Sequence, residues 1–306
     1  MSELVDVITS TYRAGQFLEG FFQNLSSQTV FHRCHLVLRM NSPDAEEIRM
    51  AEAFRRRFPD QVRLSVCRGV ETLGASWNKA INYSSSNFVT IWNVDDRRTA
   101  DSIEHSMEAL KSNPEASFVF GSFMIENPRR FFRKHRQVVS SSPSESELFT
   151  GMAIGPFFMF RREIFDVVGP FDEQYKTAAD YDFAMRLVRL ARGIHVPKVL
   201  GSFLDLGKGL STNGSMLQPI ERTAVELRYG FYPKIKGRYL KSAIMYDELY
   251  LDAGGVKIPV TRFLPSLEDE KSSLRSAELE SLEGNQRRQG LRNAVFRLKD
   301  YVDNFK

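Results

Sequence analysis

Short apolar runs and amphipathic segments alternate along residues 4–123 of the chain. Runs rich in β-branched residues predict buried strands, whereas apolar residues at helical spacing predict helices. The predicted strands are 4–11, 34–40, 62–67, 87–93 and 116–123, and the predicted helices between them are 14–28, 44–58, 74–84 and 100–112. Since helices separate the strands, we expect an α/β fold with a mostly parallel sheet covered by helices on both faces.

The alternation stops after residue 123. Residues 128–136 (PRRFFRKHR) are basic and aromatic, and are either a solvated loop or a contact with anionic lipid or a pyrophosphate-linked acceptor. Residues 137–150 are polar, and are either disordered or a lid on the acceptor side that orders on binding. A strand at 155–162, a helix at 180–192, a strand at 196–206 and helices from about 218 onward follow.

Composition narrows the class of protein. A net charge of +4 on 306 residues is too weak to predict nucleic-acid binding. Two cysteines make no disulfide framework and predict buried free thiols in a reducing compartment. No apolar window approaches the ~20 residues of a membrane span, and the N-terminus does not read as a signal peptide. We therefore expect a cytoplasmic protein and leave peripheral membrane contact open.

Phenylalanine is unusually frequent, with 24 residues against 2 Trp and 10 Tyr. Most of these side chains fall on strand and helix faces and are expected in the core. The remaining ones gather around the candidate acceptor loop, where we expect exposure to matter: Phe131, Phe132, Phe157 and Phe158.

Two adjacent acids, Asp95 and Asp96, end the fourth predicted strand in the sequence WNVDD. Ligands of parallel α/β sheets bind at the carboxyl ends of the strands. Mg²⁺ and Mn²⁺ are commonly held there by one or two carboxylates together with phosphate oxygens of a substrate. The doublet alone is also compatible with a turn, or with pairing of Asp96 to Arg97 or Arg98.

Four motifs together resemble those of family 2 glycosyltransferases with the GT-A fold. They stand in the family's order and approximate spacing: TSTYRAG (9–15), LGASWNKAI (73–81), NVDD (93–96) and VGPFDEQYKTAADYDFAMRL (168–187). The resemblance implies a Rossmann-like GT-A domain over residues 1–215. It leaves 216–306 as a C-terminal helical extension that serves either packing or oligomerisation, so a homodimer through these helices is open.

The resemblance implies a metal-dependent, inverting hexosyltransferase that moves a sugar from a nucleotide-diphosphate sugar to an acceptor hydroxyl. Its cofactor would be Mn²⁺ or Mg²⁺. Its acceptor would be a glycan or a lipid-linked glycan in surface polysaccharide synthesis, and no nucleic acid is expected as a partner.

Motif position also implies roles for single residues. Asp180 would be the general base, and Asp95 the metal ligand with Asp96 ligating or orienting. The residues implied in binding the nucleotide sugar are Thr9, Thr11, Tyr12, Asn41, Gly74, Trp77, Asn78, Asn93 and Asp95. By its position alone, Asp180 also reads as the N-cap of the predicted helix.

The sequence departs from the family's pattern in three places. Arg39 and Met40 stand where the family has the acid that hydrogen-bonds the nucleotide base, so the base is open. Asn93 replaces the first acid of the metal motif, and Ala179 stands where Glu often precedes the base. The segment 204–212 also lacks the histidine that some members use for metal binding.

These departures keep a second hypothesis open, a binding scaffold that retains the fold without turnover. A sugar-nucleotide pyrophosphorylase is a third hypothesis. Such enzymes usually carry a glycine-rich, arginine-containing loop after the first strand, and TSTYRAG has a single glycine.

Overall fold

The computed structural model describes residues 4–128, 135–140, 152, 154–207, 209, 217–229, 250–253 and 256–259. The chain divides into two compact units, Met1–Gln218 and Pro219–Lys306. Each unit is described by itself. Among the described residues, the helices are too short or too polar to reach across a lipid bilayer.

A mixed sheet forms the centre of the first unit. Its described strands run in the order β3-β2-β1-β4-β8-β6-β9-β5, with β7 beside β6. The bounds are β1 Val5–Tyr12, β2 Cys34–Asn41, β3 Val62–Cys67, β4 Phe88–Ile91, β5 Arg97–Arg98, β6 Phe118–Glu126, β7 His135–Val138, β8 Met159–Arg161 and β9 Gly193–Leu204. Strands β1 to β4 pair in parallel, whereas β8 lies antiparallel between β4 and β6. The mostly parallel α/β sheet predicted from the sequence is confirmed.

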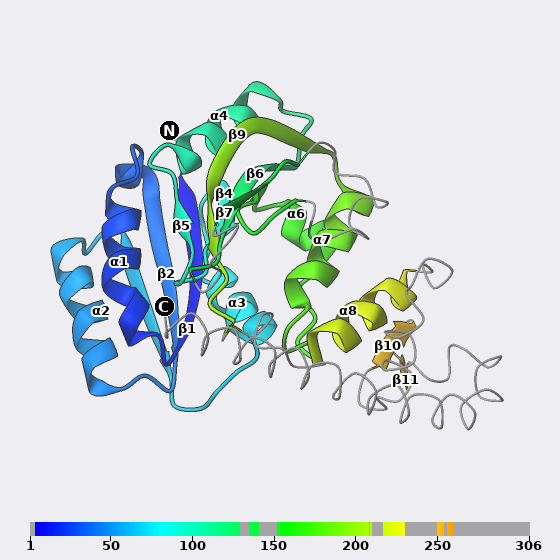
Figure 1. Ribbon diagram of the computed structural model, residues 1–306, viewed down its shortest axis with the longest axis horizontal. Coiled ribbons are helices and arrows are strands. Elements are labelled where there is room, and N and C mark those ends of the chain that lie inside the picture. Colours follow the sequence, from blue (N-terminus) through cyan, green and yellow to red (C-terminus); the bar gives the residue numbers. More distant parts are fainter. Residues whose placement is uncertain are drawn as a thin grey trace, which may run out of the picture. The chain divides into compact units, whose positions relative to one another are not determined.

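Helices cover both faces of this sheet. The helices of the first unit are α1 Gly15–Ser26, α2 Ala45–Arg57, α3 Leu73–Ile81, α4 Ser102–Ser112, α6 Ile164–Val168 and α7 Ala179–Leu190. Figure 1 shows α1 and α2 on one face of the sheet and α3, α6 and α7 on the other. The carboxyl ends of the parallel strands therefore lie between two helical layers.

The phenylalanine surplus is explained by the core. Phe171 and Phe183 stack at 4.3 Å, and Phe158 lies 6.3 Å from Phe183 in the same aromatic cluster. Phe157 and Phe158 are each only 2% exposed, so the expectation that they are surface residues around an acceptor loop is wrong. Phe131 and Phe132 lie outside the described residues.

Parts of the segment after β6 also differ from expectation. His135–Val138 form β7 and pair antiparallel with the end of β6, so these four residues are an ordered strand and neither a loop nor a disordered segment. The rest of the basic stretch, 129–134, and residues 141–151 lie outside the described residues.

α8 (Leu217–Arg228), which begins at the end of the first unit and continues into the second, is helical as expected. β10 (Tyr250–Ala253) and β11 (Val256–Pro259) form an antiparallel pair, so the expectation of helix throughout this part is wrong. Gly254-Gly255 between two apolar runs is a hairpin signal that the helical interpretation overlooked. Residues 260–306 lie outside the described residues.

Candidate functional site

The carboxyl ends of neighbouring parallel strands gather the polar residues predicted from the motifs. Tyr12 at the end of β1 lies in register with Asn41 at the end of β2, which in turn lies opposite Cys67 of β3. On the other side of β1, strand β4 ends at Ile91, and the acidic segment 92–96 follows. All these ends therefore meet at one edge of the sheet, where α/β proteins bind ligands.

The acid doublet at this edge has two distinct members. Asp96 is 1% exposed, and its carboxylate accepts hydrogen bonds from the backbone N–H of Leu204 (3.2 Å) and from Nδ2 of Asn93 (3.3 Å). Asp95 is partly exposed. Asp96 therefore orients the turn and the end of β9, whereas Asp95 is the member open to a ligand.

Burial raises the pKa of Asp95, and burial followed by the charge of neighbouring Asp95 raises the pKa of Asp96. A divalent cation beside two such carboxylates would favour their ionised forms. In the part of the chain that the structure describes, no group of three His, Cys, Asp or Glu gathers around them. The doublet therefore fits a hard cation that takes its other ligands from phosphate oxygens and water.

Arg98, which the motif analysis did not single out as a site residue, is a buried guanidinium directly behind the doublet. It is 3% exposed and donates to Oγ1 of Thr90 (2.7 Å) and to the carbonyl oxygens of Ile91 (3.0 Å) and Phe157 (3.2 Å). The rings of Trp92 and Phe157 each lie 5.1 Å from it. Arg98 thus ties the end of β4 to the segment before β8.

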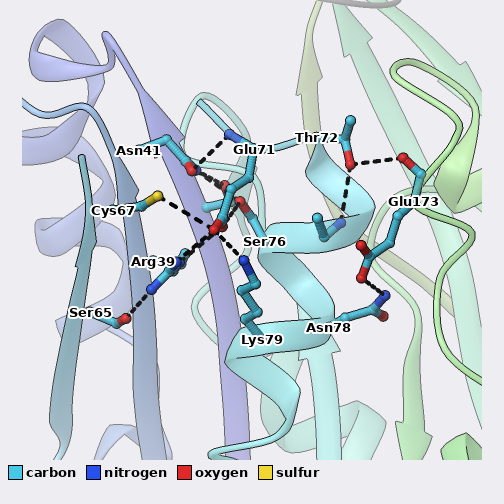
Figure 2. A network of polar contacts seen from close by, with 12 residues as sticks. Arg39, Asn41, Ser65, Cys67, Glu71, Thr72, Ser76, Asn78, Lys79 and Glu173 are labelled. Carbon is cyan, nitrogen blue, oxygen red and sulfur yellow. Dashed lines mark hydrogen bonds and ion pairs between the residues drawn. The ribbon is translucent and has the colours of Figure 1, made fainter. Parts of the chain in front are cut away.

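A second polar cluster lies at the ends of β2 and β3 (Figure 2). Nε and Nη2 of Arg39 donate to the two carboxylate oxygens of Glu71, at 3.1 and 2.7 Å, and Nζ of Lys79 donates to Glu71 at 2.5 Å. These donors, Arg39 first, lower the pKa of Glu71 to about 2. Sequence reasoning found Arg39 as a departure but missed Glu71, because Glu71 lies in the loop after β3 and meets Arg39 only in the folded chain.

Both polar groups of the Asn41 side-chain amide are hydrogen-bonded within the protein. Its Nδ2 donates to the hydroxyls of Ser10 (3.0 Å) and Ser76 (2.9 Å), and its Oδ1 accepts from the backbone N–H of Glu71 (3.3 Å). The side chain is 2% exposed. Asn41 therefore joins β1, β2 and α3, and its contact with a donor base stays a prediction.

Helix α3 carries three of the predicted donor residues, Gly74, Trp77 and Asn78. Asn78 exchanges hydrogen bonds with both backbone polar groups of Phe171, and Trp77, 3% exposed, packs against the Phe171 ring at 5.1 Å. A Cβ on Gly74 would lie 3.1 Å from the carbonyl oxygen of Asp172. These contacts are with the protein's own loop, so donor binding by the three residues stays a prediction.

Asp180 is the second residue of α7, whose N-cap is Ala178, so the interpretation of Asp180 as the N-cap is wrong. Its Oδ1 accepts from the N–H of Tyr181 at 2.8 Å. Asp182 is fully buried and paired with Arg186 at 2.8 Å. A Cβ added to Gly74 would lie 3.4 Å from the Cβ of Ala179. The start of α7 therefore adjoins the start of α3.

The three predicted residues of β1 differ in accessibility. Thr9 and Thr11 are buried, with 0% and 2% exposure, whereas Tyr12 is 46% exposed. Asn93 is partly exposed beside Asp96. Tyr12, Asn93 and Asp95 are therefore the predicted donor residues that present surface at this edge.

Comparison with known proteins adds to this geometry. The sequence pattern of the family described as "Glycosyl transferase family 2" matches residues 6–169. The fold is similar to that of S. aureus TarS, residues 1–349, in complex with UDP-GlcNAc: the TM-score is 0.61 at 15% identity over 82% of this chain and 68% of that chain. It is also similar to the mannosyltransferase PcManGT from Pyrobaculum calidifontis in complex with GDP-Man and Mn²⁺, with a TM-score of 0.54 at 17% identity over 80% and 64%. No curated protein matches the sequence.

Proposed function

Since this chain belongs to glycosyl transferase family 2, and is therefore a glycosyltransferase of the predicted GT-A fold, we propose that it is a metal-dependent, inverting enzyme. It moves a sugar from a nucleotide-diphosphate sugar onto an acceptor hydroxyl. A glycan or lipid-linked glycan of a surface polysaccharide is the acceptor class we propose.

The observation that carries this proposal is the acid doublet at the carboxyl end of β4. Asp96 is fixed by Asn93 and by the backbone of Leu204, and in turn holds partly exposed Asp95 at the sheet edge. A cation on Asp95 would offset the charge that develops on the nucleoside diphosphate as it leaves. PcManGT, which has a similar fold, is in complex with GDP-Man and Mn²⁺, and this supports a diphosphate donor and a metal for the present chain.

Asp180 is proposed as the general base. An acceptor hydroxyl is a weak nucleophile, so a carboxylate must take its proton as the new bond forms. The acceptor oxygen attacks the anomeric carbon, the bond from that carbon to the diphosphate oxygen breaks, and the proton goes to Asp180. Attack opposite the leaving group inverts the configuration. The partly exposed position of Asp180 near the start of α3 supports this role.

A thermal-shift screen of UDP-, GDP-, CDP-, ADP- and dTDP-sugars, each with and without Mn²⁺, tests the donor half of the proposal. A donor at 100 times its Kd stabilises the native state by about 2.7 kcal/mol. We expect one nucleotide class to raise the Tm only in the presence of Mn²⁺, and its sugar to be transferred with inversion. Metal-dependent binding without transfer to a panel of glycan acceptors would favour the scaffold hypothesis, and no binding at all would contradict both.

A further inference from the structure

Two adjacent strand ends carry backbones in the left-handed region. Arg13 has φ 50° and Ser42 has φ 44°, and they are the non-glycine residues with positive φ within the described parts of the chain. They directly follow Tyr12 and Asn41, which lie in register on β1 and β2. Side chains other than glycine rarely adopt this conformation, and such residues gather at ligand sites.

The conformation of Arg13 is fixed by its surroundings. The N–H of the next residue, Ala14, donates to Oε1 of Glu47 at 2.5 Å, and Oε2 of Glu47 accepts from the N–H of Asp44 at 3.0 Å. Glu47 is 2% exposed. One buried carboxylate therefore anchors both the loop after β1 and the start of α2, and this holds the strained residue in place.

The side chain of Arg13 is exposed at the ligand edge. Its guanidinium lies 5.2 Å from the centre of the Tyr12 ring, and Tyr12 is itself 46% exposed. Within the described residues no hydrogen bond or ion pair of Arg13 is seen. The edge thus presents a cation beside an aromatic face, a pair suited to a phosphorylated nucleotide.

Three other arginines close to the ends of β2 and β4 are engaged within the protein. Arg39 is paired with Glu71, Arg97 donates to the carbonyl oxygens of Val94 and Asp96, and Arg98 is buried. Arg68, which follows β3, is also exposed, but β3 is separated from the acid doublet by β2 and β1, whereas β1 pairs directly with β4. Arg13 is therefore the exposed guanidinium that follows the strand next to the doublet.

We propose that Arg13 binds the diphosphate of the donor through its guanidinium. Guanidinium groups form charge-assisted, often bidentate hydrogen bonds with phosphate oxygens. This role rests on the proposed function and adds to it Arg13, which stands inside the motif TSTYRAG but is not among the donor residues that the family resemblance implies. The strained backbone at Arg13 is then a cost in stability that serves donor binding.

The variant Arg13→Asn should separate the effect of the strained backbone on stability from the effect of the guanidinium on donor binding. Asn adopts the left-handed region more readily than Arg, so we expect the Tm to stay the same or rise by roughly 1–3 °C. Affinity for the diphosphate should fall about 10- to 100-fold, as for loss of a charge-assisted hydrogen bond. Affinity for the corresponding nucleoside, which has no phosphate, should not change. Ser42→Asn is the matched control, because it also places Asn at a residue with positive φ but removes no charge. It should leave the affinities for diphosphate and nucleoside unchanged.

The measurement is calorimetric titration of the full chain with Mn²⁺ and UDP, GDP, CDP, ADP or dTDP, followed by the nucleoside of the one that binds. Equal diphosphate affinity for Arg13→Asn and the wild-type chain would overturn the role of Arg13 and leave the proposed function standing. Equal losses for nucleoside and diphosphate would overturn the phosphate contact. If the wild-type chain binds none of the diphosphates, the proposed function fails and this role fails with it.

Discussion

The side-chain amide of Asn78 pairs with the backbone of Phe171 through both of its polar groups. Nδ2 donates to the carbonyl oxygen at 2.9 Å, and Oδ1 accepts from the N–H at 2.8 Å. The same Nδ2 also donates to Oε1 of Glu173 at 2.9 Å (Figure 2). Helix α3, which follows the donor edge, is thereby fixed to the segment that leads into α7 and Asp180.

Asn78→Asp should lower kcat without changing donor affinity. The new carboxylate oxygen would face the carbonyl of Phe171, displace the segment before α7 and misplace Asp180. Misplacement of a reacting group by about 1 Å costs up to 10²-fold in rate, so we expect kcat to fall roughly 10- to 100-fold. Steady-state kinetics with varied donor and acceptor measure the effect.

Asn82→Asp is the matched control, because Asn82 is the C-cap of the same helix and is exposed. It should change neither kcat nor KM. A rise in donor KM for Asn78→Asp with kcat unchanged would instead support the donor contact that the family resemblance implies.

Substitutions of Asp180 and of Asp182 should affect different properties, the first activity and the second stability. Asp180→Asn should keep the Tm and donor binding while transfer falls by about 10²- to 10⁴-fold, as for loss of a general base. Asp182→Asn breaks a buried pair with Arg186 and should lower the free energy of unfolding by about 3 kcal/mol. Urea unfolding and transfer assays on both variants measure this. Retained transfer by Asp180→Asn would show that this carboxylate has only a structural role.

Periodicity predicted the first four parallel strands well because β1, β2 and β4 are mostly buried apolar runs and β3, at the edge of the sheet, alternates apolar and polar residues. The strand predicted at 62–67 has the bounds of β3. The fourth, predicted to run to residue 93, stops at Ile91, since Nε1 of Trp92 donates to the carbonyl oxygen of Asp96 at 3.2 Å and the chain turns. A local turn stabilised by one side chain leaves no periodic signal.

The site residues that belong to motifs could be predicted from the sequence. Those held by contacts between distant parts of the chain could not. Asp95 and Asp96 stand at the sheet edge as the motif predicts. The partner of Arg39 was not predictable, because Glu71 lies 32 residues away in the loop between β3 and α3, outside any paired strand. Nor does any local pattern indicate that Asn41 would be 2% exposed.

Asp95→Asn should abolish the dependence of nucleotide binding on Mn²⁺ with little effect on the Tm. Asn keeps the size of the side chain but removes the charge that a hard cation requires. Asp96→Asn should weaken Mn²⁺ less, because Asp96 is engaged by Asn93 and Leu204. Calorimetric titration of each variant with and without Mn²⁺ decides this. Metal-dependent binding that survives in Asp95→Asn would place the cation elsewhere.

Glu71 should make stability depend on pH in the acid range. Its pKa in the folded protein is about 2, against an ordinary 4.5, chiefly because Arg39 donates to it. A lowered folded-state pKa contributes stability that is fully present above pH 4.5 and is lost as pH falls toward 2. Because solvent reaches the pair and screens it, we expect Glu71→Gln to cost only about 1–2 kcal/mol at pH 7.

The difference in the free energy of unfolding between Glu71→Gln and the wild-type chain should narrow as the pH is lowered from neutrality to 3, because protonation of Glu71 in the unfolded chain removes part of its charge-dependent contribution. Glu46→Gln is the matched control, because Glu46 also pairs with an arginine, Arg49, but on the exposed face of α2. Screening by solvent makes such surface pairs nearly neutral, so this variant should follow the wild-type curve at every pH. A gap for Glu71→Gln that is as large at pH 3 as at pH 7 would mean that Glu71 stabilises the cluster through packing and neutral hydrogen bonds rather than through its charge.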